Sequence, residues 1–349
     1  MNTRMKTVTL STDDLFYLMR NILIIILSLF VLSACRDDRQ EDFFLSENGV
    51  KIHRYDRLQF EASVLNSFTS LQKMNTNFPH ATKLLIEDVL AIGSVDDEKI
   101  NDRLCAYYSD TSLVNLMLDV EDKYKDLTHL EKELTKSFVR LKKELPSMPI
   151  PVVYSQISAL NQSIVVSDSL IGISLDKYMG EDYPMYKRYY YSYQRKSMNP
   201  ERILPDCISF YLLSLYPFPW EQNHRTLFDV IMYRGKIAWI TEKVIGSKGL
   251  GSVALGYSVQ QLEWCNKNRK QFVDWVNKTN HLERTDPMII RAYVQPMPNS
   301  VLKNEVPPMI GVWLGMVYID AYMKKNPDVT IEQLLNNTDY KGMLMDIDI

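Results

Sequence analysis

The chain has few histidines and few cysteines, and their spacing excludes the common metal sites. Its 349 residues include five histidines and four cysteines. No histidine has a second histidine four residues later, none is followed directly by glutamate, and no two cysteines form a C-x-x-C pair. A mononuclear zinc peptidase typically uses H-E-x-x-H, because two imidazoles on one helical face hold the metal while the glutamate deprotonates its water. We therefore expect no metal and no cofactor.

Signatures of other enzyme and binding classes are also missing. No serine lies in a G-x-S-x-G nucleophile elbow, which removes support for an α/β hydrolase. Residues 249–254 fit a loose G-x-G-x-x-A pattern, but they follow a predicted helix rather than a strand, so the pattern predicts a turn and not a dinucleotide site. The net charge of −3 and the pI near 6.0 show no basic excess. We expect no nucleic-acid partner.

The one long apolar run lies near the N-terminus. Arg20 precedes an apolar stretch over residues 22–32, and Ser33-Ala34-Cys35 follows it. A positive end, a short apolar run and small residues at its exit are typical of a secretory signal. The ending resembles the bacterial lipobox, in which acyl chains such as palmitate are attached to the cysteine. This pattern predicts a signal peptide at residues 1–34, lipid attachment at Cys35, and a lipidated, largely polar tether at 35–48.

The predicted lipid anchor indicates where the protein lies and that the membrane is its first partner. Several buried acyl methylenes hold a protein on a bilayer, so the membrane is a partner through Cys35. We expect a membrane-anchored lipoprotein of the cell envelope, on the periplasmic face or the cell surface, that contacts other envelope proteins.

The remaining residues, 49–349, predict a single mostly α-helical α+β domain. Helical periodicity dominates residues 49–148, which we interpret as a scaffold, and Ser94 with Asp97 resembles a capping box that starts a helix there. Residues 149–349 form the strand and helix core. Short β-branched runs near 149–155, 164–168 and 171–176 predict a small antiparallel sheet. Long helices are expected at 200–216, 227–239, 258–277 and 309–325, with a short one at 330–336.

A tyrosine-rich loop at residues 183–196 has the most unusual composition in the chain. Its aromatic rings could pack the loop onto the neighbouring helices while its cations point to water. Alternatively, its aromatic and arginine side chains could contact a partner, because these residue types dominate interface hot spots. The candidate partner surface comprises Tyr183, Tyr186, Arg188, Tyr189, Tyr191 and Arg195.

Several sequence blocks resemble the gliding-motility lipoprotein family GldB of Bacteroidetes. They occupy residues 171–184, 198–206, 229–236, 256–265, 310–315 and 321–328, and they occur in order along the chain. The resemblance implies an envelope lipoprotein associated with gliding motility and with the protein-secretion apparatus on which gliding depends. It implies no enzymatic activity and no cofactor.

The order of strands and helices also resembles that of zincin-like peptidases, which carry an H-E-x-x-H helix followed by a glutamate helix. In that comparison residues 205–210 fall near the zinc helix and residues 232–236 on the glutamate helix. Arg234 stands where related sequences tend to have an acidic residue, and a cation there would repel a metal ion. The resemblance therefore implies a non-catalytic pseudo-peptidase domain.

We accordingly expect a lipid-anchored binding or assembly protein and no enzyme. Two alternatives remain open. The first is a zinc-dependent metallopeptidase with an atypical ligand set, such as His224 with Asp206 or Asp229. The second is a glycan- or peptidoglycan-binding lipoprotein that uses Tyr189 and Tyr191 of the tyrosine-rich loop.

Overall fold

A four-stranded mixed sheet lies beside a set of packed helices. The computed structural model describes residues 49–345 except 168, 248, 298–300 and 303–304. The sheet has the order β1-β2-β4-β3, in which β1 pairs parallel with β2, β2 pairs parallel with β4, and β4 pairs antiparallel with β3. The expectation of an antiparallel sheet is therefore correct only for the β3–β4 pair. The strands are β1 (Ile52–His53), β2 (Val152–Gln156), β3 (Ile164–Ser167) and β4 (Leu170–Ser174).

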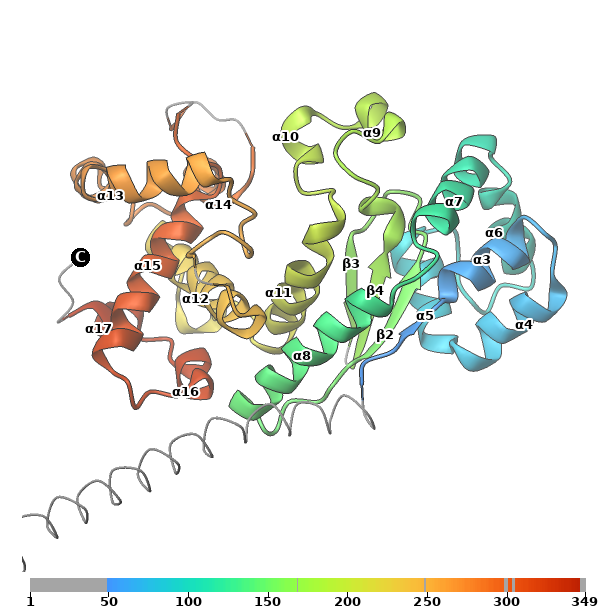
Figure 1. Ribbon diagram of the computed structural model, residues 1–349, viewed down its shortest axis with the longest axis horizontal. Coiled ribbons are helices and arrows are strands. Elements are labelled where there is room, and N and C mark those ends of the chain that lie inside the picture. The colour runs from blue at the N-terminus through green and yellow to red at the C-terminus, as the bar shows by residue number, and fades with distance from the viewer. Residues whose placement is uncertain (1–48, 168, 248, 298–300, 303–304, 346–349) are drawn as a thin grey trace, which may run out of the picture. The chain divides into compact units, whose positions relative to one another are not determined.

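The first part of the domain is helical, as the periodicity predicts. Figure 1 shows the helices α3 to α7 on one side of the sheet, with α8 running across it. Ser94 does not begin a helix, because α6 starts at Ile100 and a turn precedes it. The elements are α3 (Tyr55–Ser63), α4 (Phe68–Asn77), α5 (Pro79–Lys83), a π-helical turn (Leu84–Val89), α6 (Ile100–Tyr108), α7 (Thr111–Lys123) and α8 (Thr128–Glu144).

One charged side chain of α8, that of Glu131, binds the edge strand of the sheet. The Glu131 carboxylate accepts a hydrogen bond of 2.9 Å from the backbone amide of Ile52, on the edge strand β1. Thr135, one helical turn later, accepts one from the amide of Val50. The amides of Val50 and Ile52 have no partner in a neighbouring strand. Thr135 and Glu131 accept hydrogen bonds from them and so hold this segment against α8.

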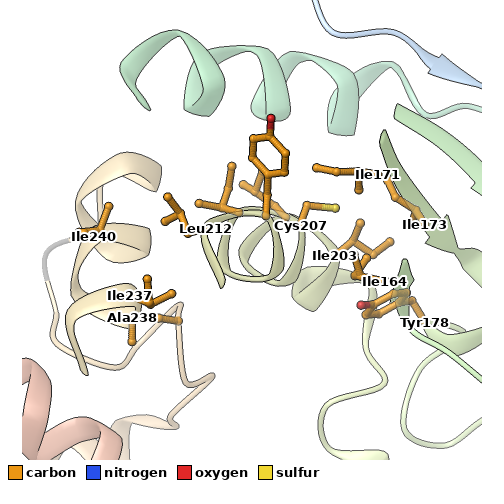
Figure 2. Close-up of a cluster of buried hydrophobic side chains, with 14 of the residues drawn as sticks. Ile164, Ile171, Ile173, Tyr178, Ile203, Cys207, Leu212, Ile237, Ala238 and Ile240 are labelled. Carbon is orange, nitrogen blue, oxygen red and sulfur yellow. The ribbon is translucent and has the colours of Figure 1, made fainter. Parts of the chain in front are cut away.

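A buried helix, α11, separates the sheet from the C-terminal helices. Figure 2 shows Ile203 and Cys207 of α11 beside the strand residue Ile173, while Leu212 approaches α12. All four side chains are buried. Before α11 lie a 3-10 turn (Leu175–Lys177), α9 (Pro184–Tyr189), α10 (Ser192–Arg195) and a 3-10 turn (Pro200–Arg202); α11 itself is Ile203–Leu215, and a 3-10 turn (Trp220–Gln222) leads to α12 (Leu227–Ile245).

The central helix of the second part is α12, which is buried on almost every side. It packs against α8, α11, α14, α15 and α16. The predicted helix over 227–239 is confirmed and extends six residues further, to Ile245, where Gly246 caps it in the left-handed conformation. The remaining helices are α13 (Val259–Thr279), α14 (Pro287–Val294), α15 (Ile310–Lys325), α16 (Ile331–Asn336) and α17 (Tyr340–Leu344).

Candidate functional site: a cavity on helices α11 and α12

A cavity of about 570 Å³ opens beside α11 and α12. One wall comes from α11 and another from α12, and the turn before α13 and the start of α15 complete it. The tyrosine-rich segment contributes Tyr193 and Lys196 at one side. The cavity therefore gathers side chains from segments more than 100 residues apart in the sequence.

A network of polar groups fixes the α11 wall. Arg202 donates to the Asp206 carboxylate at 2.8 Å, one helical turn away, and to the carbonyl oxygens of Val253 and Ala254 in the turn before α13. The Tyr178 hydroxyl donates to the second Asp206 oxygen at 2.9 Å. Burial raises the pKa of Asp206, although Arg202 and Tyr178 oppose that shift by stabilising the carboxylate. Asp206 thus already has a cation and a hydroxyl as partners.

The turn that Arg202 contacts is also held by a buried carboxylate. Oε1 of Glu242, on α12, accepts hydrogen bonds from the backbone amides of Gly251, Val253 and Ala254 at 2.9 to 3.1 Å. Three amides that converge on one oxygen form the kind of concave site in which proteins bind anions. The chain fills this one with its own glutamate, which fixes the turn that the sequence predicts at residues 249–254.

Two cationic side chains of the cavity, Lys196 at its side and Arg234 on α12, lack a partner within the described residues, and Arg234 is the one that a buried helix carries. It projects from α12 into the cavity and is exposed there, whereas its neighbours Tyr233 and Gly235 are buried. No hydrogen bond or ion pair of its guanidinium is present in the described part of the chain. Protein atoms surround the group on most sides, so that desolvation lowers the pKa of Arg234.

The tyrosine-rich segment forms α9 and α10, which project beyond α11 in Figure 1. Tyr186 does not lie on the surface: it is fully buried, its hydroxyl donates to the Asp176 carbonyl, and it accepts from the Met179 amide. This corrects the placement of Tyr186 in the candidate partner surface. Tyr183 is also held, because its hydroxyl donates to the Asp119 carboxylate at 2.6 Å.

Arg188, Tyr189 and Tyr191 of that candidate surface face outward. Tyr189 and Tyr191 are 57% and 73% exposed. The Tyr191 ring stacks on Tyr193 with the two planes only 8° apart, and Arg188 lies over the Tyr189 ring. We call Arg188, Tyr189, Tyr191 and Tyr193 the tyrosine surface. Arg195 points back toward the chain and donates to the carbonyl of Glu181.

His224, considered above as an atypical metal ligand, lies beside the start of α12. His224 Nδ1 lies 2.9 Å from the Asp229 carboxylate, whose other oxygen accepts from the amides of Arg225 and Thr226. Burial tends to raise the pKa of Asp229, but these hydrogen bonds outweigh it and lower the pKa. The structure thus brings His224 to Asp229, whereas Asp206 pairs with Arg202. Within residues 49–345, less the gaps given above, no three His, Cys, Asp or Glu side chains lie together as a metal site.

A comparison with protein families matches residues 37–346 to the model described as gliding motility protein GldB. The chain belongs to the GldB family. Comparisons with curated proteins and with solved structures each found no match.

The GldB family assignment and the cavity are connected through the sequence blocks that carry the resemblance. Four of these blocks meet at the cavity. They contribute Asp206 from block 198–206, Arg234 from 229–236, Tyr257 from 256–265 and Val312 from 310–315. Histidine spacing could not reveal this site. The available signal was a pair of cations, Arg234 and Lys236, in the otherwise largely apolar segment 231–239, because a charge in a buried helix needs a reason to be there.

The predicted lipid anchor of this GldB family member lies outside the described residues. The signal peptide at 1–34, Cys35 and the tether at 35–48 all belong to that part of the chain. Among the helices that the structure does describe, none combines the length and apolarity needed to cross a membrane. Cys105, Cys207 and Cys265 are free thiols.

Proposed function

We propose that this GldB family member is a lipid-anchored protein of the cell envelope that acts in gliding motility, and in the secretion on which gliding depends, by binding other envelope proteins. It does no chemistry of its own in this proposal. The observation that carries the binding role is the tyrosine surface, where large aromatic rings are exposed.

Physical chemistry supports a protein partner for this surface. Exposed Tyr189 and Tyr191 offer large, stiff, partly apolar contacts, which lose little conformational entropy when a partner binds. Arg188 adds a cation beside the Tyr189 ring. The hydrogen bonds of Tyr183 and Tyr186 to the body of the domain fix α9, so that the exposed rings are presented on a rigid base.

The second part of the proposal is that the domain is a non-catalytic relative of zincin-like peptidases. Asp206 and Phe210 stand four residues apart on α11 and both line the cavity, which is the spacing that two imidazoles of a zinc helix require. Phenylalanine has no ligand atom, and the Arg234 guanidinium on the following long helix would repel a metal cation. The residues that line this position therefore favour binding over hydrolysis.

The binding role is tested in the bacterium that carries the gene. Replacing Tyr189 and Tyr191 together by serine should stop colony spreading while the amount of protein in the membrane fraction stays normal. The matched control is Phe68→Ser with Leu65→Ser, two exposed apolar residues at α4 and just before it. Normal spreading by the tyrosine variant would overturn the proposed surface, as would equal loss in the control.

The anchor is tested separately with Cys35→Ala. We expect this variant to lose its lipid, as metabolic labelling with a palmitate analogue would report, and to leave the membrane fraction. Retention of label would place the lipid elsewhere. Because Cys35 lies far from the tyrosine surface in the sequence, failure of this test leaves the surface test intact.

The exposed, stacked Tyr191–Tyr193 pair also suits a sugar ring, so a glycan role is the second candidate. The double tyrosine variant separates the two. Loss of pull-down by purified peptidoglycan would favour the glycan, whereas loss of cross-links to envelope proteins with peptidoglycan binding unchanged would favour the protein partner. Peptide cleavage that is sensitive to EDTA and lost in His224→Ala would instead support the metallopeptidase alternative.

A further inference from the structure

The guanidinium of Arg234 makes no hydrogen bond or ion pair with the described residues of the fold. Among the nineteen residues of α12, Arg234 and Lys243 are the exposed ones, and the residues on either side of Arg234 are buried. Holding a guanidinium in partly desolvated surroundings costs free energy unless an anion pairs with it. No carboxylate in the described residues does so. The group missing from this cavity is therefore an anion that would pair with Arg234.

The other charges of the cavity do not fill it. Asp206 is the one acidic residue of the lining, and Arg202 and Tyr178 already occupy both of its oxygens. The lining carries three cations, Lys196, Arg202 and Arg234, against this single carboxylate. The charged side chains of the lining therefore carry a net positive charge, which favours an anion in the cavity.

The rest of the lining is largely apolar. Beside Arg234 lie Ile237 and Ala238 of α12, and across the cavity Phe210 and Leu213 of α11 present further apolar surface. Phe210 is 41% exposed, which is unusual for a phenylalanine of a helix whose other face is in the core. A ligand that only carried charge would leave this apolar surface in water.

We propose that the cavity binds an amphiphile that has one oxyanionic head group, a carboxylate or a phosphate, on an apolar body. The head pairs with the fork of Arg234, which matches the geometry of either oxyanion. The body lies on the apolar walls of α11 and α12. A volume of about 570 Å³ suits a ligand of small-molecule size. The cavity adjoins the tyrosine surface, because Tyr193 belongs to both, but the proposal does not depend on the function proposed for that surface.

The probes are octanoate, octyl phosphate and uncharged octanol, titrated calorimetrically into the full chain held in neutral-lipid nanodiscs, with empty nanodiscs subtracted. We expect at least one anion to bind better than octanol, and the tighter anion identifies the head group. Arg234→Gln should weaken that anion by on the order of 10- to 100-fold, as expected for loss of a charge-assisted hydrogen-bond pair. Affinity for octanol should not change.

Two further variants make the result specific. Arg188→Gln removes a cation from the tyrosine surface and should leave every affinity unchanged. Arg234→Lys keeps the charge but lacks the fork, so it should bind the anion with intermediate affinity and also serves if Arg234→Gln does not fold. The proposal is overturned if neither anion binds, if octanol binds as well as both anions, or if Arg234→Gln and Arg188→Gln have equal effects.

Discussion

Gly235 of α12 and Gly315 of α15 face each other where the two helices cross. A Cβ atom added to Gly235 would lie 2.5 Å from the Cα of Gly315, and one added to Gly315 would overlap the carbonyl oxygen of Ile231. The obstacle in both cases is backbone, which cannot move aside as a side chain can. The backbones of α12 and α15 are therefore as close as two glycines allow, and this crossing sets the position of Arg234, the residue before Gly235.

This contact makes Gly235→Ala and Gly315→Ala destabilising. We expect each to lower the free energy of unfolding by about 1–3 kcal/mol or more, the usual range for overpacking, because one helix must shift. Urea denaturation followed by circular dichroism measures the loss. Gly249→Ala is the control, since its nearest neighbour is the Ser252 hydroxyl at 3.3 Å. A change below about 0.5 kcal/mol in both crossing variants would contradict the close contact.

Replacement by phenylalanine should have different effects on the free energy of unfolding at two buried tyrosines, Tyr108 and Tyr154. The Tyr108 hydroxyl donates to the Ile157 carbonyl at 2.6 Å and accepts from the Gln59 amide at 2.9 Å. The Tyr154 hydroxyl is buried and has no hydrogen-bond partner in the described residues. Tyr108→Phe should therefore cost about 1–2 kcal/mol of unfolding free energy, whereas Tyr154→Phe should be neutral or stabilising.

The comparison of these tyrosine variants needs no further control, because both substitutions remove one oxygen from a buried ring. Parallel denaturation curves give the difference directly. Equal destabilisation by Tyr108→Phe and Tyr154→Phe would mean that the Tyr154 hydroxyl has a partner such as a buried water molecule.

Local signals in the sequence predict the helices better than the sheet or the site. Helices α13 and α16 start directly after Ser258 and Thr330, whose capping boxes are visible in the sequence. The parallel pairing of β2 with β4 is long-range, because β3 lies between them in the sequence but at the sheet edge in space. Short β-branched runs do not encode that order. The antiparallel prediction failed for this reason.

The candidate site was harder to predict because it depends on which face of each helix is buried. In the tyrosine-rich segment Tyr186 is buried while Tyr189 is exposed, although both belong to the same short helix. Composition identifies such a segment but not the orientation of its rings. The cavity combines α11, α12 and α15, and no spacing within one element reports that assembly.

The contribution of Lys236 to the free energy of unfolding should rise with pH. Its ammonium is buried, donates to the carbonyls of Leu335 and Asn337, and has no carboxylate partner among the described residues. Burial lowers the pKa of Lys236 from 10.5 to about 8. Between these values the unfolded chain binds more protons than the folded one, so the free energy of unfolding increases with pH.

Burial also raises the pKa values of Cys105, Cys207 and Cys265, and these thiols lower the free energy of unfolding as pH rises from 8 to 9.5, so the Lys236 effect is measured as a difference between variants. We expect wild type to gain about 1–2 kcal/mol relative to Lys236→Met across this window. Lys270→Met, on the exposed face of α13, should behave as wild type. Urea midpoints measured at several pH values provide the test, and identical slopes in wild type and Lys236→Met would contradict it.

Glu242 should control the order of the turn that forms one wall of the cavity. Its Oε1 is the common acceptor for the amides of Gly251, Val253 and Ala254. Glu242→Ala would leave three amides without their acceptor and would also release the carbonyls to which Arg202 donates. We expect a loss of about 2–5 kcal/mol in the free energy of unfolding, because hydrogen bonds to a buried charge are lost together.

Hydrogen exchange followed by mass spectrometry resolves where this loss falls. Exchange at residues 249–256 should accelerate in Glu242→Ala more than exchange in α8 or α3, because the amides of the turn lose their acceptor while those helices keep their backbone hydrogen bonds. Glu263→Ala, an exposed carboxylate of α13, is the matched control and should leave the turn protected. If the turn stays protected in Glu242→Ala, other contacts, such as the backbone hydrogen bond from Tyr257 to the Gly251 carbonyl, must hold it, and the carboxylate is not what shapes the cavity wall.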